Sequence, residues 1–394
     1  MDVLVTCLNY PYPLENGENL RIFHYVRALR ARHTFDLVCR GSDEVPPPLR
    51  DLFRHVVPVL GEMVLPRGGV LRRLAASFSV DQTFPAIPDL TSALAICLDT
   101  RRYDLIWSAG DVLPRLPQQN SVPVLGDIVD DLVLQYRRLL ASLHPGIRYL
   151  RVLKRLQLMK SVERRYFGRA DACLYVSEAD ARSFASVCPD TPVHVIHNGV
   201  DETFFRPEGV AVESETLVFE GNMSFYPNVD AAEYFCTEIL PLVHAVKPAV
   251  KFILVGKNPS SRVRALASDH VAVTGFVDDI RPYLSRAAVF VSPTRVGAGI
   301  KNKILQAWSM GKAVVATPAS TGGLRVRDRQ NLIIADSPRS FADAVLELLE
   351  DENLREGMGA SGRQTVLDHY TWNAKALEME ALMIKLTARR MRHA

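Results

Sequence analysis

Residues 288–318 read AVFVSPTRVGAGIKNKILQAWSMGKAVVATP. The apolar run 288–292 predicts a short buried strand, and 313–317 predicts a second one. Between them, apolar residues recur at helical spacing over 300–310. The stretch therefore predicts a strand, a glycine-containing loop, a helix and a second strand.

The loop before this helix has the chemistry of a phosphate site. Gly297 and Gly299 let backbone N–H groups approach a ligand closely, and the helix start adds roughly half a positive charge. Lys301 and Lys303 add two mobile cations, and Asn302 adds an amide. A phosphate or pyrophosphate is therefore the expected ligand.

The sequence also indicates where this helix ends. Gly311 is expected to end it, because glycine suits the left-handed conformation that follows many helices. Lys312 is expected in the last turn, where a cation suits the helix dipole.

Length and composition set the frame. A chain of 394 residues favours two domains over one. The net charge of +3 is too small to indicate nucleic-acid binding by itself. No run approaches the ~20 apolar residues that span a bilayer. A strand is expected from Asp2, so we expect no secretory signal and a cytoplasmic protein. The six cysteines are scattered without a Cys-x-x-Cys pair, so we expect free, buried thiols.

Short apolar runs alternate with helical patterns along the whole chain, which predicts an α/β protein. Strands are expected at 2–7, 35–39, 103–107, 122–125, 172–176, 193–196, 216–220, 251–255 and 271–274, besides the two quoted above. A single long helix is expected over 228–247. The turn dipeptide Asn198-Gly199 and the linker-like run 208–214 separate two halves.

The quoted stretch resembles the donor site of family-4 retaining glycosyltransferases. Residues 299–307 are most similar to a subgroup associated with exopolysaccharide gene systems, whose pattern is Gly-Ile-x-Asn-Lys-x-Leu-Glu-Ala. The run from Asn198 to Phe205 resembles the interdomain hinge of the family. The resemblance implies a GT-B fold, in which two doubly wound parallel-sheet domains face a cleft. It implies an acceptor-side domain at 1–200, a nucleotide-sugar donor domain at 201–370, and a helix at 371–394 that returns to the first domain.

Three acidic positions of the family pattern are absent here. Ala298 and Gln306 stand where the family has two glutamates, and Gly322 stands where the subgroup has a third. In the family the first glutamate holds donor sugar hydroxyls and the second holds the ribose. Gln306 can still form a hydrogen bond to a ribose, whereas the side chain of Ala298 cannot.

The resemblance also assigns candidate residues. Lys303 is the candidate catalytic cation, which would stabilise charge on a leaving diphosphate. The candidate donor-binding residues are Gly17, Arg21, Gly221, Asn222, Gly275, Phe276, Val277, Gly297, Ala298, Gly299, Ile300, Lys301, Asn302 and Gln306. For Gly17 an ordinary turn glycine is the alternative, and for Arg21 a solvated helix residue.

Asp127 and Asp130 follow a predicted strand, at an edge where α/β proteins bind ligands. They are candidate catalytic carboxylates, which could hold sugar hydroxyls or steady a cationic transition state. The alternative is capping of the helix expected from Leu132. Many relatives have a histidine after the strand at 103–107, but Ser108 and Ala109 occupy that place here.

Residues 136–169 hold ten arginines and lysines against one acid, Glu163. Such a segment can lie on an anionic membrane surface. The alternative is a helix that packs an apolar stripe, including Leu150, Leu156 and Met159, on the first domain and leaves its charges in water. Contact with the inner face of the membrane stays open.

The reaction implied is transfer of a hexose, with retention, from a nucleotide diphosphate sugar to a saccharide or lipid-linked acceptor. No metal or other cofactor is expected, because no metal-ligand spacing is present. Two alternatives remain: a nucleotide-sugar-binding protein without turnover, and a GT-B nucleotide-sugar epimerase.

Overall fold

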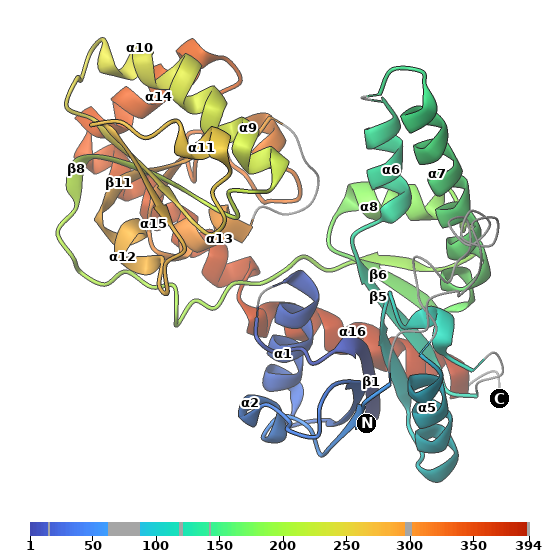
Figure 1. The fold of residues 1–394 in the computed structure, drawn as a ribbon. Coiled ribbons are helices and arrows are strands. Elements are labelled where there is room, and N and C mark those ends of the chain that lie inside the picture. Colours follow the sequence, from blue (N-terminus) through green and yellow to red (C-terminus); the bar gives the residue numbers. More distant parts are fainter. Residues whose placement is uncertain (15, 62–86, 118–120, 142, 296–301, 392–394) are drawn as a thin grey trace. The chain divides into compact units, whose positions relative to one another are not determined.

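The computed structural model describes residues 1–394 except 15, 62–86, 118–120, 142, 296–301 and 392–394. Contacts divide the chain into two units (Figure 1). The first comprises residues 1–197 together with 375–394, and the second comprises 198–374. The sequence-based boundaries were 200/201 and 370/371.

The first unit is built on a seven-stranded sheet with the order β3-β2-β1-β4-β5-β6-β7, in which all neighbours are parallel. Its strands are β1 Asp2–Asn9, β2 Thr34–Arg40, β3 His55–Val59, β4 Leu105–Ala109, β5 Val124–Val129, β6 Ala172–Tyr175 and β7 Val193–Val195. The central strands are apolar on both faces, because helices cover both sides of a parallel sheet. The sequence did not predict β3.

The second unit contains a six-stranded parallel sheet with the order β10-β9-β8-β11-β12-β13. Its strands are β8 Glu213–Glu220, β9 Lys251–Val255, β10 Val271–Gly275, β11 Ala287–Ser292, β12 Ala313–Ala316 and β13 Ile333–Ile334. The strands predicted here are confirmed to within a few residues at their ends.

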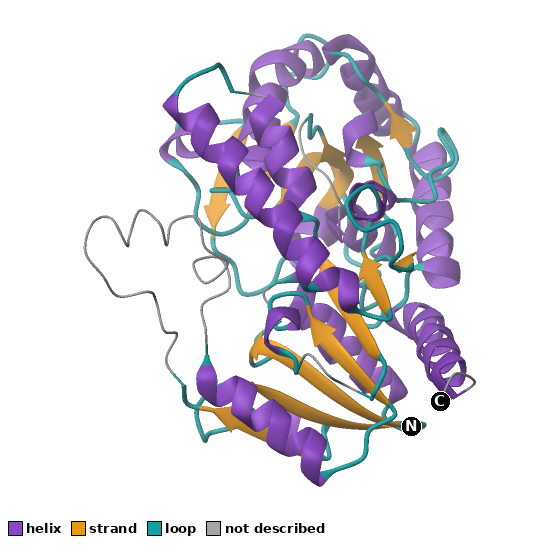
Figure 2. Cartoon of the chain, turned by 90° about the vertical axis from the view of Figure 1, so that its right-hand side faces the viewer, coloured by secondary structure: helices purple, strands orange, loops and turns teal. Residues whose placement is uncertain are grey.

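Helices flank the strands of each unit (Figure 2). Those of the first unit are α1 Gly17–Leu29, α2 Pro47–Arg50, α5 Pro88–Thr100, α6 Leu132–Ala141, α7 Ile147–Arg165 and α8 Glu178–Ala185. Those of the second are α9 Tyr226–Tyr234, α10 Leu240–His244, α11 Ser261–Arg264, α12 Arg281–Arg286, α13 Asn302–Ser309, α14 Pro338–Glu350 and α15 Glu352–His369. The helix α16, Trp372–Met391, begins in the second unit and belongs to the first from Lys375 onward.

In each sheet the strand order reverses next to the strand that comes first in the sequence. In the first unit the order turns between β1 and β4, and in the second between β8 and β11. At such a point the loops leave neighbouring strands in opposite directions, which opens a crevice at the carboxyl ends. The topology therefore marks one candidate ligand-binding edge in each unit.

The long helix predicted over 228–247 is interrupted. Between α9 and α10 the chain makes a π-helical turn, Phe235–Ile239, just before Pro241. Proline has no N–H to donate and its ring clashes with the carbonyl four residues earlier, so the wider turn accommodates it.

The end of α13 confirms one prediction and corrects another. Gly311 has φ +70°, the left-handed conformation expected after a helix. Lys312 does not serve the dipole of α13. It is buried, and its Nζ donates to the carbonyl oxygens of Ser285 and Ala287, at 2.5 and 3.0 Å, at the end of α12.

The apolar stripe predicted on α7 is partly wrong. Leu156 and Met159 are buried, as expected, but Leu150 is 57% exposed. Val152 and Val162 complete the buried face instead. All six cysteines are free, and all but Cys236 are buried, which agrees with the expectation of buried thiols.

Candidate active site

Three glycines lie at the carboxyl ends of neighbouring strands in the second unit. Gly221 follows β8, Gly256 follows β9 and Gly275 ends β10, with φ values of +154°, +144° and +74°. A Cβ at Gly256 would lie 1.8 Å from the carbonyl oxygen of Gly221, so only glycine fits there. Bare backbone therefore lines this edge, next to the point where the strand order reverses.

Lys303, in the first turn of α13, is held at the same edge. Its Nζ donates to Asn228 Oδ1 at 2.8 Å and lies 4.3 Å from the centre of the Phe219 ring. Asn228 is itself fixed, because its Nδ2 donates to the carbonyl oxygen of Asn222 at 2.9 Å. A Cβ at Gly221 would lie 3.1 Å from Lys303 Nζ. The ammonium is thus positioned directly beside the backbone of Gly221.

Glu220, which sequence reasoning did not select, ends β8 beside this lysine. Burial raises the pKa of its carboxyl, and the positive charge of Lys303 opposes that rise. Its signal in the sequence was its place at the carboxyl end of a predicted strand.

The other candidate donor residues have varied surroundings. Asn222 is exposed and its Oδ1 accepts from Ser224, Phe276 is 70% exposed, and Val277 packs partly against the core. Asn302 Oδ1 is buried without a hydrogen-bond partner among the described residues, and Gln306 is half-buried on α13. Gly297, Ala298, Gly299, Ile300 and Lys301 lie outside the described residues.

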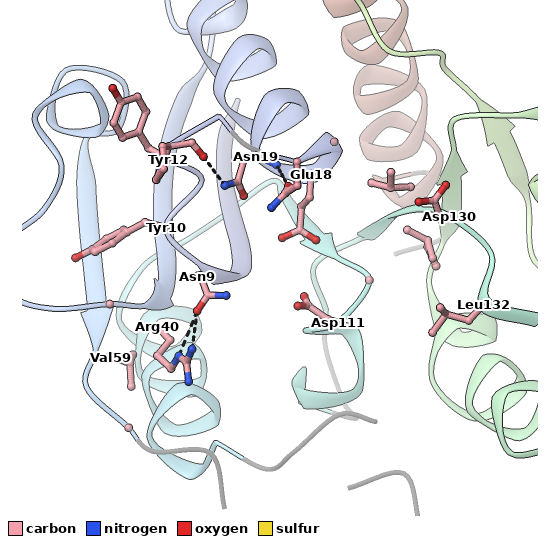
Figure 3. Close-up of a pocket in the computed structure, with 18 of the residues that line it drawn as sticks. Asn9, Tyr10, Tyr12, Glu18, Asn19, Arg40, Val59, Asp111, Asp130 and Leu132 are labelled. Atoms are coloured by element: carbon pink, nitrogen blue, oxygen red, sulfur yellow. Dashed lines mark hydrogen bonds between the residues drawn. The ribbon is translucent and has the colours of Figure 1, made fainter. Parts of the chain in front are cut away.

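A pocket of about 1220 Å³ lies at the carboxyl ends of β1 to β5 in the first unit. Figure 3 shows the polar side chains that line it, among them Asn9, Glu18, Arg40 and Asp111. Gly17 lines it too, as the first residue of α1 after the N-cap Asn16. The pocket occupies the edge that the strand order marks in this unit.

Arg21 and Asp127 form a buried ion pair beneath this edge. Arg21 Nε lies 3.1 and 3.0 Å from the two carboxylate oxygens of Asp127, and an Nη donates to the Ile196 carbonyl at 2.9 Å. Arg21 is 0% exposed, so its interpretation as a solvated helix residue is wrong. Burial opposes the charge of Arg21, but Asp127 and Tyr25 leave its pKa raised overall. This geometry gives the ion pair a structural role. The role of Arg21 in donor binding and that of Asp127 in catalysis stay predictions.

Asp130 and Asp131, which follow Asp127 in the chain, have different surroundings. Asp131, which is fully buried, caps α6, since its Oδ1 accepts from the backbone N–H of Leu134 at 3.0 Å. Asp130 lines the pocket. The capping alternative therefore applies to Asp131, and Asp130 stays the candidate carboxylate.

Two carboxyl groups that sequence reasoning missed face one another in the pocket (Figure 3). Glu18 comes from the first turn of α1, and Asp111 follows β4. Burial, together with the negative charges of Asp111 and Asp127, raises the pKa of Glu18 to about 8. Burial raises the pKa of Asp111 to about 6, although Arg115 opposes the shift. The signal available in the sequence is the position of Asp111 two residues after Ala109, close to the place where many relatives have a histidine.

Two further properties concern the described part of the chain only. No group of three or more His, Cys, Asp or Glu side chains there is arranged to hold a metal ion. No described helix combines the length and apolar character needed to cross a membrane.

Comparison with family models finds one match in each half of the chain. The profile of "Glycosyltransferase Family 4" matches residues 16–204, and that of "Glycosyl transferases group 1" matches residues 214–351. The chain belongs to the family-4 glycosyltransferases.

A curated relative of this glycosyltransferase is a GDP-mannose-dependent alpha-(1-6)-phosphatidylinositol monomannoside mannosyltransferase from Mycobacterium tuberculosis. The two are 28% identical over 251 residues, which cover 57% of this chain and 64% of the relative. The chain thus spans less than two thirds of the length of this relative.

Solved structures establish the fold as GT-B. Sucrose-phosphate synthase from Thermosynechococcus elongatus superposes with a TM-score of 0.71 at 18% identity, covering 98% of this chain and 99% of that one. HepE of Anabaena, solved in complex with UDP-glucose, gives 0.64 at 15% identity, covering 98% and 100%. The predicted fold class is confirmed.

Proposed function

We propose that this glycosyltransferase moves a hexose, with retention, from a nucleotide diphosphate sugar to an acceptor hydroxyl, in polysaccharide or glycolipid synthesis. The bond between C1 of the sugar and the diphosphate oxygen breaks, and a bond from C1 to the acceptor oxygen forms. The acceptor proton passes to the leaving diphosphate. The second unit would bind the donor and the first the acceptor.

The position of Lys303 carries this proposal. Its ammonium is fixed by Asn228 next to Gly221, at the glycine-lined edge of the sheet. A diphosphate bound there would gain negative charge as the C1–O bond breaks, and a cation already in place stabilises that charge without reorganisation. The named donor of the mycobacterial relative and the UDP-glucose of the Anabaena structure support a nucleotide sugar.

The proposed reaction uses no metal ion, because the lysine supplies the positive charge. Purified protein in chelator should therefore release nucleoside diphosphate from at least one member of a panel of UDP- and GDP-sugars. Release that requires magnesium or manganese would contradict the metal-free proposal. Nucleotide binding without release from any donor, with any acceptor, would favour the binding-protein alternative, which the replacements at Ala298 and Gln306 motivate.

Lys303→Ala tests the proposed role of the cation directly. A charge-assisted hydrogen bond to phosphate contributes about 1.5–3 kcal/mol, so UDP affinity should fall roughly ten- to a hundredfold. Lys251→Ala is the matched control, since Lys251 is exposed at the opposite, amino-terminal end of β9. Calorimetric titration compares the two variants, and equal effects would place the phosphate elsewhere.

We further propose that the protein works at the cytoplasmic face of an anionic membrane, which α7 contacts. At the start of this helix Ile147 and Leu150 are 73% and 57% exposed, next to Arg148 and Arg151. Exposed apolar side chains flanked by cations suit the interface of an anionic bilayer.

A further inference from the structure

The pocket of the first unit has two chemically different sides (Figure 3). Glu18 and Asp111 lie on the side of α1 and β4, and Arg40 and Asn9 on the side of β1 and β2. We propose that it binds an acceptor in which a hydroxyl-rich ring carries an anionic group, with the ring at Glu18 and Asp111 and the anion at Arg40. This inference rests on the proposed function and specifies its acceptor class.

The acidic side suits a pair of hydroxyls. The pKa of Glu18 is raised to about 8 and that of Asp111 to about 6, so the two carboxyl groups together hold one proton between these values. The pair then offers one carboxylate that accepts and one carboxylic O–H that donates. Asp111 Oδ1 is buried and has no hydrogen-bond partner within the described ranges. A bound sugar or polyol hydroxyl would supply that partner.

The opposite side suits an anion. Arg40 is held by Asn9, whose Oδ1 accepts from Nε at 3.3 Å and from Nη2 at 2.8 Å. Both bonds use the same edge of the guanidinium, and no carboxylate forms an ion pair with Arg40 in the part of the chain that the structure describes. A guanidinium that lines a pocket and is held by a neutral amide favours a phosphate or carboxylate.

The pocket also has the size and lining for such a ligand. Its volume of about 1220 Å³ exceeds the ~300–1,000 Å³ of pockets for drug-sized ligands, so a ring with an anionic substituent fits. Tyr10 and Tyr12 add aromatic surface on the side of Arg40. Tyr10 is fixed by the hydrogen bond from its hydroxyl to the Ser42 carbonyl.

Binding of small probes tests the proposal. Glucose 6-phosphate and myo-inositol 1-phosphate should each bind at least tenfold more tightly than glucose, myo-inositol or inorganic phosphate alone, by calorimetry on the full chain. Arg40→Gln should weaken phosphate-bearing probes by roughly ten- to a hundredfold and leave the parent polyols unaffected. Arg102→Gln, an exposed arginine of the same unit outside the pocket, is the matched control.

A pH profile tests the acidic side separately. The phosphate-bearing probes are mostly dianions above pH 7, since the second pKa of a phosphate monoester is about 6. Affinity should nevertheless fall as pH rises through about 8, because the pair of Glu18 and Asp111 then loses its remaining proton and with it the O–H donor. Glu18→Gln keeps a donor at every pH, so its profile should be flat over this range.

If neither phosphate-bearing probe binds better than its parent, or if Arg40→Gln behaves like Arg102→Gln, the acceptor class is wrong. Probe binding that is lost in Lys303→Ala and kept in Arg40→Gln would place the phosphate in the second unit and overturn it too. Failure of the proposed function looks different, because the release of nucleoside diphosphate would be absent while probe binding is unchanged.

Discussion

At the scale of single residues, the partner of a side chain decides its role. Asp127 and Asp130 are three positions apart and looked equivalent in the sequence. Asp127 is 4% exposed and tied to Arg21, whereas Asp130 lines the pocket. Two conservative substitutions should therefore have different consequences.

Asp127→Asn should destabilise the first unit. It removes the negative charge that faces the buried guanidinium of Arg21, and breaking a buried pair costs about 3–5 kcal/mol. Chemical denaturation measures the loss. The double variant Arg21→Met, Asp127→Leu should recover much of it, since no buried charge remains. A stable Asp127→Asn that has lost only turnover would instead support the catalytic interpretation.

Asp130→Asn should lower the rate of sugar transfer or donor hydrolysis with little change in stability or UDP affinity. The reason is its place in the pocket of the first unit, where a carboxylate can accept hydrogen bonds from the hydroxyls of a bound sugar. Steady-state kinetics and UDP titration on the same preparation separate the two effects. Unchanged turnover would remove Asp130 from the candidate site.

Glu163 provides a prediction about pH. It is 3% exposed, and burial together with Asp131 raises its pKa to about 9, against the opposing charge of Arg137. The folded protein then holds a proton that the unfolded chain, with a pKa of 4.5, releases. Stability should therefore decrease as pH rises from about 4.5 to about 9. In Glu163→Gln this decrease should be smaller, as followed by melting temperature, while the exposed Glu44→Gln should behave like the wild type.

At the scale of elements, α7 combines a buried face with an exposed, basic start. It packs beside α6 (Figure 1), and Val152, Leu156, Met159 and Val162 fill the core. Because those apolar residues are already buried, only the first turns of α7, with the exposed Ile147 and Leu150, can contact a membrane through apolar side chains.

The protein should bind anionic vesicles, and binding should weaken with salt because surface charges are screened over about 8 Å at physiological ionic strength. The variant Arg148→Gln, Arg151→Gln should bind roughly thirtyfold less at low salt, at about 1 kcal/mol per cation. Ile147→Asn should also weaken binding. Ile384→Asn, an exposed isoleucine on α16, is the control. Vesicle sedimentation measures the difference, and binding indifferent to salt and to lipid charge would exclude this contact.

At the scale of the whole molecule, the two units are built differently. The second is one continuous segment, residues 198–374, with its own apolar core. The first is completed by 375–394, where Met379 and Met383 are buried and Glu380 accepts a hydrogen bond from His33 at 2.6 Å.

Removal of residues 375–394 should therefore unfold the first unit and spare the second. The truncated chain should keep one cooperative transition and bind UDP. Met383→Ala should cost about 2–5 kcal/mol by cavity formation, and Leu377→Ala, at a 55% exposed position of the same helix, should cost little. Loss of both transitions on truncation would show that the units do not fold independently.

The predictable part of this glycosyltransferase was local in sequence. The strands β11 and β12 and the helix α13 between them follow from apolar spacing, and Gly311 follows the helix because its φ of +70° suits glycine. The repetition of this unit identified an α/β fold, and the motif around Asn302, Lys303 and Ala307 indicated the family. Such features depend only on residues a few positions apart.

The tertiary structure alone decided which charged groups meet. Arg21 and Asp127 are 106 positions apart, and Lys312 reaches carbonyls 25 and 27 positions away. Glu18 and Asp111 come together only because β1 and β4, distant in sequence, are neighbours where the strand order reverses. A sequence shows that a residue carries charge, but burial and opposing groups set its pKa and its role, and both are fixed by the order in which the strands assemble.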